Sequence, residues 1–228
     1  METAPQQRPE KQRERLNKLY RFQRHFYDLT RRFFLFGRDD LLRQMNVQPQ
    51  ERVLEVGCGT GRNLLKLSQI EPQARIYGLD AADEMLKTAG AKIDRQNKQK
   101  DIILRQGLAE EFDYLNTFRL DMPFDKIFIS YSLSMFPAWQ EAIKNALENL
   151  QPNGDLYILD FWDGASLPVW FNRLLRWWLA LFKVYARPEF LEFLKDLRTE
   201  NAGELTVTPV GRRYAFIAHF QKNKGISQ

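Results

Sequence analysis

The fold is decided by the stretch Val53-Leu54-Glu55-Val56-Gly57-Cys58-Gly59-Thr60-Gly61-Arg62-Asn63. Its apolar run ends in glycines at every second position, and an amphipathic run follows. This pattern predicts a strand, a tight turn and the start of a helix. Glycine suits the turn because the backbone must bend sharply and let a ligand approach without a Cβ in the way. The stretch therefore predicts a ligand-binding loop at the end of a strand.

A second apolar run, Ile76-Tyr77-Gly78-Leu79-Asp80, ends in an acid. An acid about 20 residues beyond a glycine loop is placed to hold the two hydroxyls of a ribose. The dinucleotide-binding fingerprint is G-x-G-x-x-G, whereas this loop reads G-x-G-x-G and follows Glu55. In these residues the chain resembles the class I S-adenosylmethionine (AdoMet) methyltransferases, which implies AdoMet as the cofactor. AdoMet has no pyrophosphate, so it needs no phosphate site at the helix N-terminus.

Strand and helix patterns alternate after Pro49. The expected strands are 52–56, 75–79, 101–105, 126–130 and 155–161, and the expected helices are 61–69, 83–95 and 138–150. Two further runs, 205–208 and 213–220, flank Pro209-Val210-Gly211 and predict a hairpin. We expect an α/β fold over residues 46–228, a Rossmann-like doubly wound seven-stranded sheet that ends in an antiparallel hairpin.

The 228 residues carry 34 Lys and Arg against 29 Asp and Glu. Residues 1–45 hold 11 of these cations and 6 of these acids, so the rest of the chain has 23 of each. The basic excess lies in this N-terminal extension, whose periodicity from Arg15 to Met45 predicts two helices around Gly37. Such a segment meets either nucleic acid or an anionic membrane surface. The polar start of the chain predicts no signal peptide and a cytoplasmic protein.

An insertion spans residues 167–197. Its first half has no acid, and at helical spacing Trp170, Leu174, Trp177, Trp178, Leu181 and Phe182 share a face, with Arg173, Arg176 and Lys183 on the other side. This composition favours a helix at the bilayer interface. The alternative is an amphipathic helix that packs on the domain's own core.

Ligands of open α/β sheets bind at the carboxyl ends of the strands. The predicted cofactor-binding residues are therefore Glu55, Gly57, Cys58, Gly59, Gly61, Asp80, Ala81, Gly107, Leu108, Ala109 and Ser130. Leu108 stands where the AdoMet superfamily usually carries an acid for adenine, so backbone groups near Leu108 and Ala109 are the expected substitute. No His, Cys, Asp or Glu cluster has metal-ligand spacing, so no metal is predicted.

The N-terminal run 20–39, dense in aromatic residues and arginines, narrows the resemblance. Together with Gln106-Gly-Leu-Ala-Glu110 and Leu181-Phe-Lys-Val184, it is similar to the bacterial diacylglyceryl-homoserine N-methyltransferases. This resemblance implies a lipid substrate, trimethylation of its homoserine amine to a betaine, and a place on the inner face of the membrane. We expect His25, Tyr27, Arg31 and Tyr131 at the catalytic site. The basic N-terminal extension (residues 1–45), here called the basic arm, and the Trp-rich insertion (residues 167–197) are expected to contact the anionic membrane.

Alternatives remain within and outside this fold. Another amine, quinone or phospholipid methyltransferase would share every cofactor motif. An RNA methyltransferase would use the basic arm for RNA, although no part of the sequence resembles an RNA-binding appendage. A non-catalytic AdoMet-binding protein would bind the cofactor without turning it over.

Overall fold

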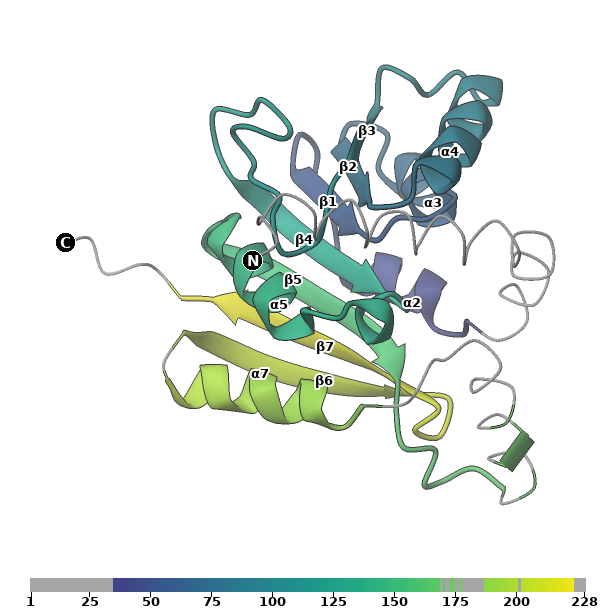
Figure 1. The fold of residues 1–228 in the computed structure, drawn as a ribbon, viewed down its shortest axis with the longest axis vertical. Coiled ribbons are helices and arrows are strands. Elements are labelled where there is room, and N and C mark those ends of the chain that lie inside the picture. The colour runs from purple at the N-terminus through teal and green to yellow at the C-terminus, as the bar shows by residue number, and fades with distance from the viewer. Residues whose placement is uncertain are drawn as a thin grey trace, which may run out of the picture.

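A seven-stranded sheet forms the centre of the molecule (Figure 1). The computed structural model describes residues 35–168, 187–200 and 202–223, together with residues 170, 173, 174 and 177. The strand order is β3-β2-β1-β4-β5-β7-β6. The strands are β1 Arg52–Val56, β2 Arg75–Asp80, β3 Ile102–Gln106, β4 Phe124–Ser130, β5 Leu150–Phe161, β6 Gly203–Val210 and β7 Ala215–Lys222. Strands β1 to β5 pair in parallel, and β7 runs antiparallel to both of its neighbours. The predicted sheet and its antiparallel end are confirmed.

Helices cover both faces of the sheet, because successive side chains of each strand point to opposite faces. The helices are α2 Arg38–Gln44, α3 Arg62–Ile70, α4 Asp83–Arg95, the short 3-10 helix η1 Leu133–Met135, α5 Trp139–Glu148 and α7 Glu189–Thr199. Side chains of α2, α3 and α4 pack with Phe128 of β4 on one face, whereas α5 and α7 pack with Ile127 and Ile129 on the other. The result is a three-layer α/β/α arrangement.

Most element boundaries differ from the sequence prediction by one or two residues, and the differences at the hairpin turn and at the start of β5 have clear causes. The hairpin turn lies at residues 211–214, and Pro209 belongs to β6, where it pairs with Phe216. Proline is tolerated there because β6 is an edge strand, so its missing N–H removes no central ladder bond. Strand β5 begins at Leu150 instead of Asp155, because Leu150 pairs with Phe124 before a shift in register.

The helices α7 and α2 lie in segments where the sequence prediction was less detailed. The helix α7 begins inside the predicted insertion 167–197 and ends beyond it, at Thr199, and it buries Phe190 and Leu194. It was not predicted from the sequence. The second predicted N-terminal helix corresponds to α2, whose Leu41 and Leu42 are buried in the main core. The first predicted N-terminal helix lies outside the described residues.

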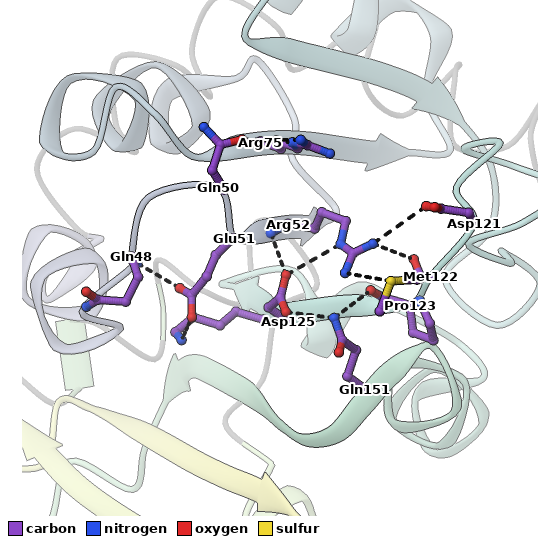
Figure 2. Close-up of polar contacts among 11 residues, drawn as sticks. Gln48, Gln50, Glu51, Arg52, Arg75, Asp121, Met122, Pro123, Asp125 and Gln151 are labelled. Atoms are coloured by element: carbon purple, nitrogen blue, oxygen red, sulfur yellow. Dashed lines mark hydrogen bonds and ion pairs between the residues drawn. The ribbon is translucent and has the colours of Figure 1, made fainter.

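The amino-terminal edge of the sheet carries a network of paired charges (Figure 2). Asp125 accepts hydrogen bonds from the backbone N–H of Arg52 and the side-chain amide of Gln151, both at 2.7 Å. The ammonium of Lys126 lies 2.8 Å from Glu51 and 3.4 Å from Asp155. These polar groups satisfy one another, so the network has a structural role at this edge of the sheet.

Candidate active site

The glycine loop leaves the carboxyl end of β1 and is fixed to the neighbouring strand β2. The backbone N–H groups of Gly57 and Cys58 both donate to the carbonyl of Leu79, at 2.8 and 2.9 Å. Gly57, Gly59 and Gly61 have φ values of 74°, 53° and 73°, a left-handed conformation that costs other residues free energy. The alternate glycines are therefore needed for the path of the backbone.

Asp80 connects this loop to the end of β2. One carboxylate oxygen accepts a hydrogen bond from Gly59 N–H at 2.8 Å, and the other accepts one from Ala82 N–H at 2.9 Å. A carboxylate can accept about four hydrogen bonds. Asp80 can therefore hold the loop and bond a ribose hydroxyl at the same time.

An apolar cavity opens between the glycine loop, Asp80 and η1. Its lining residues are Val56, Gly57, Gly59, Leu79, Asp80, Ala81, Met85, Gly107, Leu108, Ala109, Glu110, Ser132, Met135, Phe136 and Pro137. The cavity volume is about 50 Å³, well below the roughly 300 Å³ of a typical ligand pocket. We therefore expect a lining side chain such as Phe136 or Met85 to rotate when a nucleoside enters.

The loop after β3 forms one wall of this apolar cavity, and hydrogen bonds from α5 and its C-cap residue hold it in place. The side-chain amide of Asn145 donates to the carbonyls of Ala109 and Phe112, at 3.1 and 3.0 Å. The amide of Asn149 also donates to Phe112, at 3.2 Å. These bonds fix the backbone around Leu108 and Ala109, where the sequence analysis expects adenine to be recognised.

A second, polar cavity of about 480 Å³ adjoins the first at Gly57. Its lining residues are Leu35, Arg38, Glu55, Gly57, Cys58, Thr60, Arg62, Asn63, Lys92 and Ser130. Glu55 is buried and accepts a hydrogen bond from the Asn63 amide at 2.7 Å. Ser130 is buried too, and its hydroxyl has no hydrogen-bond partner among the residues that the structure describes. The wall of this cavity therefore carries three cationic side chains, Arg38, Arg62 and Lys92, and the buried carboxylate of Glu55.

The predicted cofactor residues divide between the two cavities. Gly57 lines both; Gly59, Asp80, Ala81, Gly107, Leu108 and Ala109 line the apolar cavity, and Glu55, Cys58 and Ser130 line the polar one. Gly61 lines neither and is the residue before α3. Burial, with the nearby Asp80 and Glu55 carboxylates, raises the pKa of the Cys58 thiol well above its usual value. The thiol is therefore neutral and is no nucleophile at physiological pH.

Sequence reasoning missed residues that approach the site from other segments. Arg38, Arg62 and Lys92 come from three different helices, and only the folded sheet brings them together. Met135 and Phe136 also line the apolar cavity, although they lie several residues beyond the carboxyl end of β4, where the strand-end rule predicts ligands.

Tyr131, a predicted catalytic residue, has a strained backbone and a buried side chain. Its φ is 54°, a conformation that is rare for a bulky residue. Its hydroxyl donates to the carbonyl of Phe36 at 2.6 Å, and its ring packs on Phe161 with the ring centroids 4.7 Å apart. Tyr131 lines neither cavity; it connects the end of β4 to the segment that leads into α2.

Asp160, near the end of β5, holds the wall of the apolar cavity. Its carboxylate accepts hydrogen bonds from the N–H of Ser134, in η1, at 3.2 Å and from its neighbour Phe161 at 2.8 Å. Complete burial raises the pKa of Asp160 to about 7, although these hydrogen bonds and the charge of Arg187 act in the opposite direction. The carboxyl group therefore titrates near neutral pH.

This titration predicts a pH dependence of stability. An unfolded aspartate has a pKa of about 3.9, so between pH 4 and 7 the folded state holds a proton that the unfolded state has lost. The contribution of Asp160 to stability is therefore complete below about pH 4 and is lost as the pH rises through 7. We expect the free energy of unfolding to fall by on the order of 2 kcal/mol between pH 5 and 8 because of this group.

Urea unfolding of the parent and of Asp160→Asn at both pH values checks this expectation. The amide does not titrate, so the variant should lack this part of the pH dependence, even if its absolute stability is lower. An equal pH dependence in both proteins would contradict the assignment of the titration to Asp160.

His25, Tyr27 and Arg31, which were predicted at the catalytic site, lie outside the described residues. Within the described ranges, no group of three His, Cys, Asp or Glu side chains could hold a metal ion. No helix in the described part of the chain is long and apolar enough to cross a bilayer.

The seven-stranded sheet, its antiparallel end and the glycine loop facing Asp80 define a class I AdoMet-dependent methyltransferase. The chain belongs to the methyltransferase domain family, whose sequence profile matches residues 48–204. The same fold occurs in an AdoMet-dependent methyltransferase from Aquifex aeolicus (TM-score 0.60, 19% identity, 84% of this chain and 93% of that one). It also occurs in an O-methyltransferase family protein from Burkholderia thailandensis (TM-score 0.69, 15% identity, 88% and 59%).

Curated relatives of this chain are named demethylmenaquinone methyltransferases. The protein from Lactobacillus johnsonii is 31% identical over 69% of this chain and 60% of its own length. The protein from Geobacillus kaustophilus is 29% identical over 62% of this chain and 54% of its own length. The chain thus spans somewhat more than half the length of the relatives that it matches.

The residues at the site fit AdoMet. At Gly57 a Cβ would lie 2.5 Å from the Ser132 hydroxyl, so only glycine lets Ser132 pack this closely against the loop where the two cavities adjoin. Asp80 would hold the ribose, the loop around Leu108 would face the adenine, and Glu55 would face the amino-acid end. AdoMet supplies an electrophilic methyl group when bound, so the protein has to bind and orient an acceptor and exclude water.

Proposed function

We propose that this protein transfers methyl groups to the amine of diacylglyceryl-homoserine and forms the betaine lipid diacylglyceryl-trimethylhomoserine. The observation that carries the proposal is the polar cavity beside the glycine loop, with Arg38, Arg62 and Lys92 in its wall. Its volume of about 480 Å³ falls within the roughly 300–1,000 Å³ range of ligand pockets.

The homoserine head group carries a carboxylate and an amine. Arginine and lysine are the side chains that bind carboxylates, and the buried Ser130 hydroxyl adds a further polar group to the cavity wall. Arg62 is oriented by Asp39, whose carboxylate lies 2.7 Å from its guanidinium. The amino-acid end of AdoMet has the same two charged groups, so we expect cofactor and acceptor to meet in this cavity beside Gly57.

The acceptor nitrogen must be unprotonated to take a methyl group. The rate should therefore rise with pH until the substrate nitrogen or a neighbouring base has titrated. Aromatic faces can stabilise the permanent cation that forms.

A second candidate is methylation of a quinol ring, favoured by the relatives named demethylmenaquinone methyltransferase. A quinol is flat and largely apolar, so AdoMet's amino-acid end would be the only charged ligand in the polar cavity. The homoserine head group would bring a second carboxylate to Arg38, Arg62 and Lys92, which favours it over the quinol.

Expression in a bacterium that makes no betaine lipid tests the proposal. The trimethylated lipid should form only when this chain is produced together with the enzyme that makes diacylglyceryl-homoserine. Methylation of phosphatidylethanolamine without that enzyme would assign the activity to a phospholipid. Methylation of no lipid in either strain would contradict the proposal.

A pair of variants on α4 tests the role of the polar cavity. Lys92→Gln should raise the KM for the lipid about tenfold or more, because a charge-assisted hydrogen bond contributes about 1.5–3 kcal/mol. The matched control is Lys87→Gln, since Lys87 is exposed on the same helix, pairs with Asp83 at 2.6 Å and lines neither cavity. Equal KM values for the two variants would remove Lys92 from the acceptor site.

A further inference from the structure

Three large apolar side chains are exposed in the segment that follows β5. Trp170 is 69% exposed, Leu174 is 48% exposed and Trp177 is 62% exposed. All three residues are helical, and their spacing of four and three residues places them on one side of a helix. Exposed apolar groups gathered in this way mark a surface that binds a partner.

The charges around this face are basic. Residues 164–188 contain four Lys and Arg and no acid. Arg173, also exposed, lies three residues from Trp170 and four from Trp177. It therefore borders the apolar side chains, and the prediction that it lies on the other side of the helix is wrong. The preceding acid, Asp163, forms an ion pair with Arg213 of the hairpin turn, and Arg212 beside it is exposed. Tryptophans bordered by cations suit the boundary between anionic head groups and acyl chains.

The face lies at the edge of the sheet that holds the cavities. Strand β5 runs parallel to β4, which runs parallel to β1, so the segment after β5 leaves at the edge where the glycine loop lies. Figure 1 shows this green segment beyond the end of β5. A bilayer bound there would lie on the same side of the molecule as the polar cavity.

We propose that the Trp170–Leu174–Trp177 face docks the protein on an anionic lipid surface. This proposal does not depend on the proposed function. Docking can be tested on vesicles that contain no methyl acceptor. Tryptophan rings insert at the head-group boundary, and Arg173 and Arg212 contact lipid phosphates. Since these contacts are partly electrostatic, binding weakens as salt shortens the screening length.

Flotation of the full chain with phosphatidylglycerol–phosphatidylcholine vesicles tests the docking surface. The parent should bind these vesicles, bind pure phosphatidylcholine more weakly, and dissociate as salt is raised. Trp170→Ala combined with Trp177→Ala should weaken binding at least about tenfold, because both exposed rings lose their apolar contact with lipid. AdoMet affinity should be unchanged, since neither ring lines the cavities.

The matched control is Leu115→Ala combined with Met122→Ala. These side chains are 55% and 46% exposed, and both belong to the segment between β3 and β4, away from the end of β5. The control should bind vesicles as the parent does. Equal binding by the tryptophan variant and the parent would overturn the proposal. Self-association that the tryptophan variant loses, without any vesicle binding by the parent, would assign the face to a second copy and would also overturn it.

Discussion

Asp80→Ala is expected to lose at least about thirtyfold in affinity for AdoMet. The variant removes the acceptor for the ribose hydroxyls and also the two hydrogen bonds that hold Gly59 and Ala82. Hydrogen bonds to a charged group contribute about 1.5–3 kcal/mol each, and 1.4 kcal/mol corresponds to a factor of about ten. Isothermal titration calorimetry of the parent and the variant measures the difference.

The matched control for this variant is Asp83→Ala. Asp83 lies three residues further on, its side chain is 48% exposed, and its partner is Lys87 on the helix surface. Its loss removes the same charge from the same end of α4 without touching the apolar cavity. Equal AdoMet affinities for Asp80→Ala and the parent would show that the cofactor does not use this carboxylate.

Gly57→Ala is expected to abolish measurable AdoMet binding and to lower the melting temperature. Its φ of 74° costs an alanine about 1–2 kcal/mol. The new methyl would also lie 2.5 Å from the Ser132 hydroxyl and 2.7 Å from its Cβ, so the wall of the cavity must move. Overlap of this kind costs about 1–3 kcal/mol. Each kcal/mol corresponds to roughly 2–4 °C for a chain of this size, and thermal unfolding with and without AdoMet measures both effects.

Gly90→Ala is the control for the glycine substitution. Gly90 lies in the interior of α4, and among the described residues no atom other than those of its chain neighbours and its own helix backbone lies within 4 Å of where its Cβ would be. Alanine is favoured over glycine in a helix by about 1 kcal/mol, so this variant should be slightly more stable and should bind AdoMet as the parent does. A Gly57→Ala variant that AdoMet stabilises as much as Gly90→Ala would contradict our account of the loop.

The sequence predicted the parts of the fold that local signals encode. The helix at Asp83–Arg95 and the strand at Arg52–Val56 have the boundaries that were predicted, because apolar periodicity and glycine punctuation mark their ends. The contact between Gly59 and Asp80 could also be predicted from the sequence, because adjacent parallel strands bring their carboxyl ends together. Pairing of β5 with β4 from Leu150 onward had no local signal, since it depends on the partner strand.

The polar cavity could not be predicted because its cations are distant in the chain. Arg38, Arg62 and Lys92 belong to three helices that meet only when α2, α3 and α4 pack on one face of the sheet. In the sequence each of them is an ordinary charge on an amphipathic helix. The burial of Asp160 could not be predicted from the sequence either, because it depends on η1 packing over the end of β5.

Transfer of labelled methyl groups to lipid vesicles tests the central claim most directly. The purified chain receives AdoMet labelled in its methyl group, together with vesicles that contain either diacylglyceryl-homoserine or demethylmenaquinol. Our account predicts label in the homoserine lipid, with mass increments of one, two and three methyl groups, and none in the quinol. Label in the quinol alone, or in neither lipid, would contradict the proposal that the polar cavity holds a zwitterionic head group.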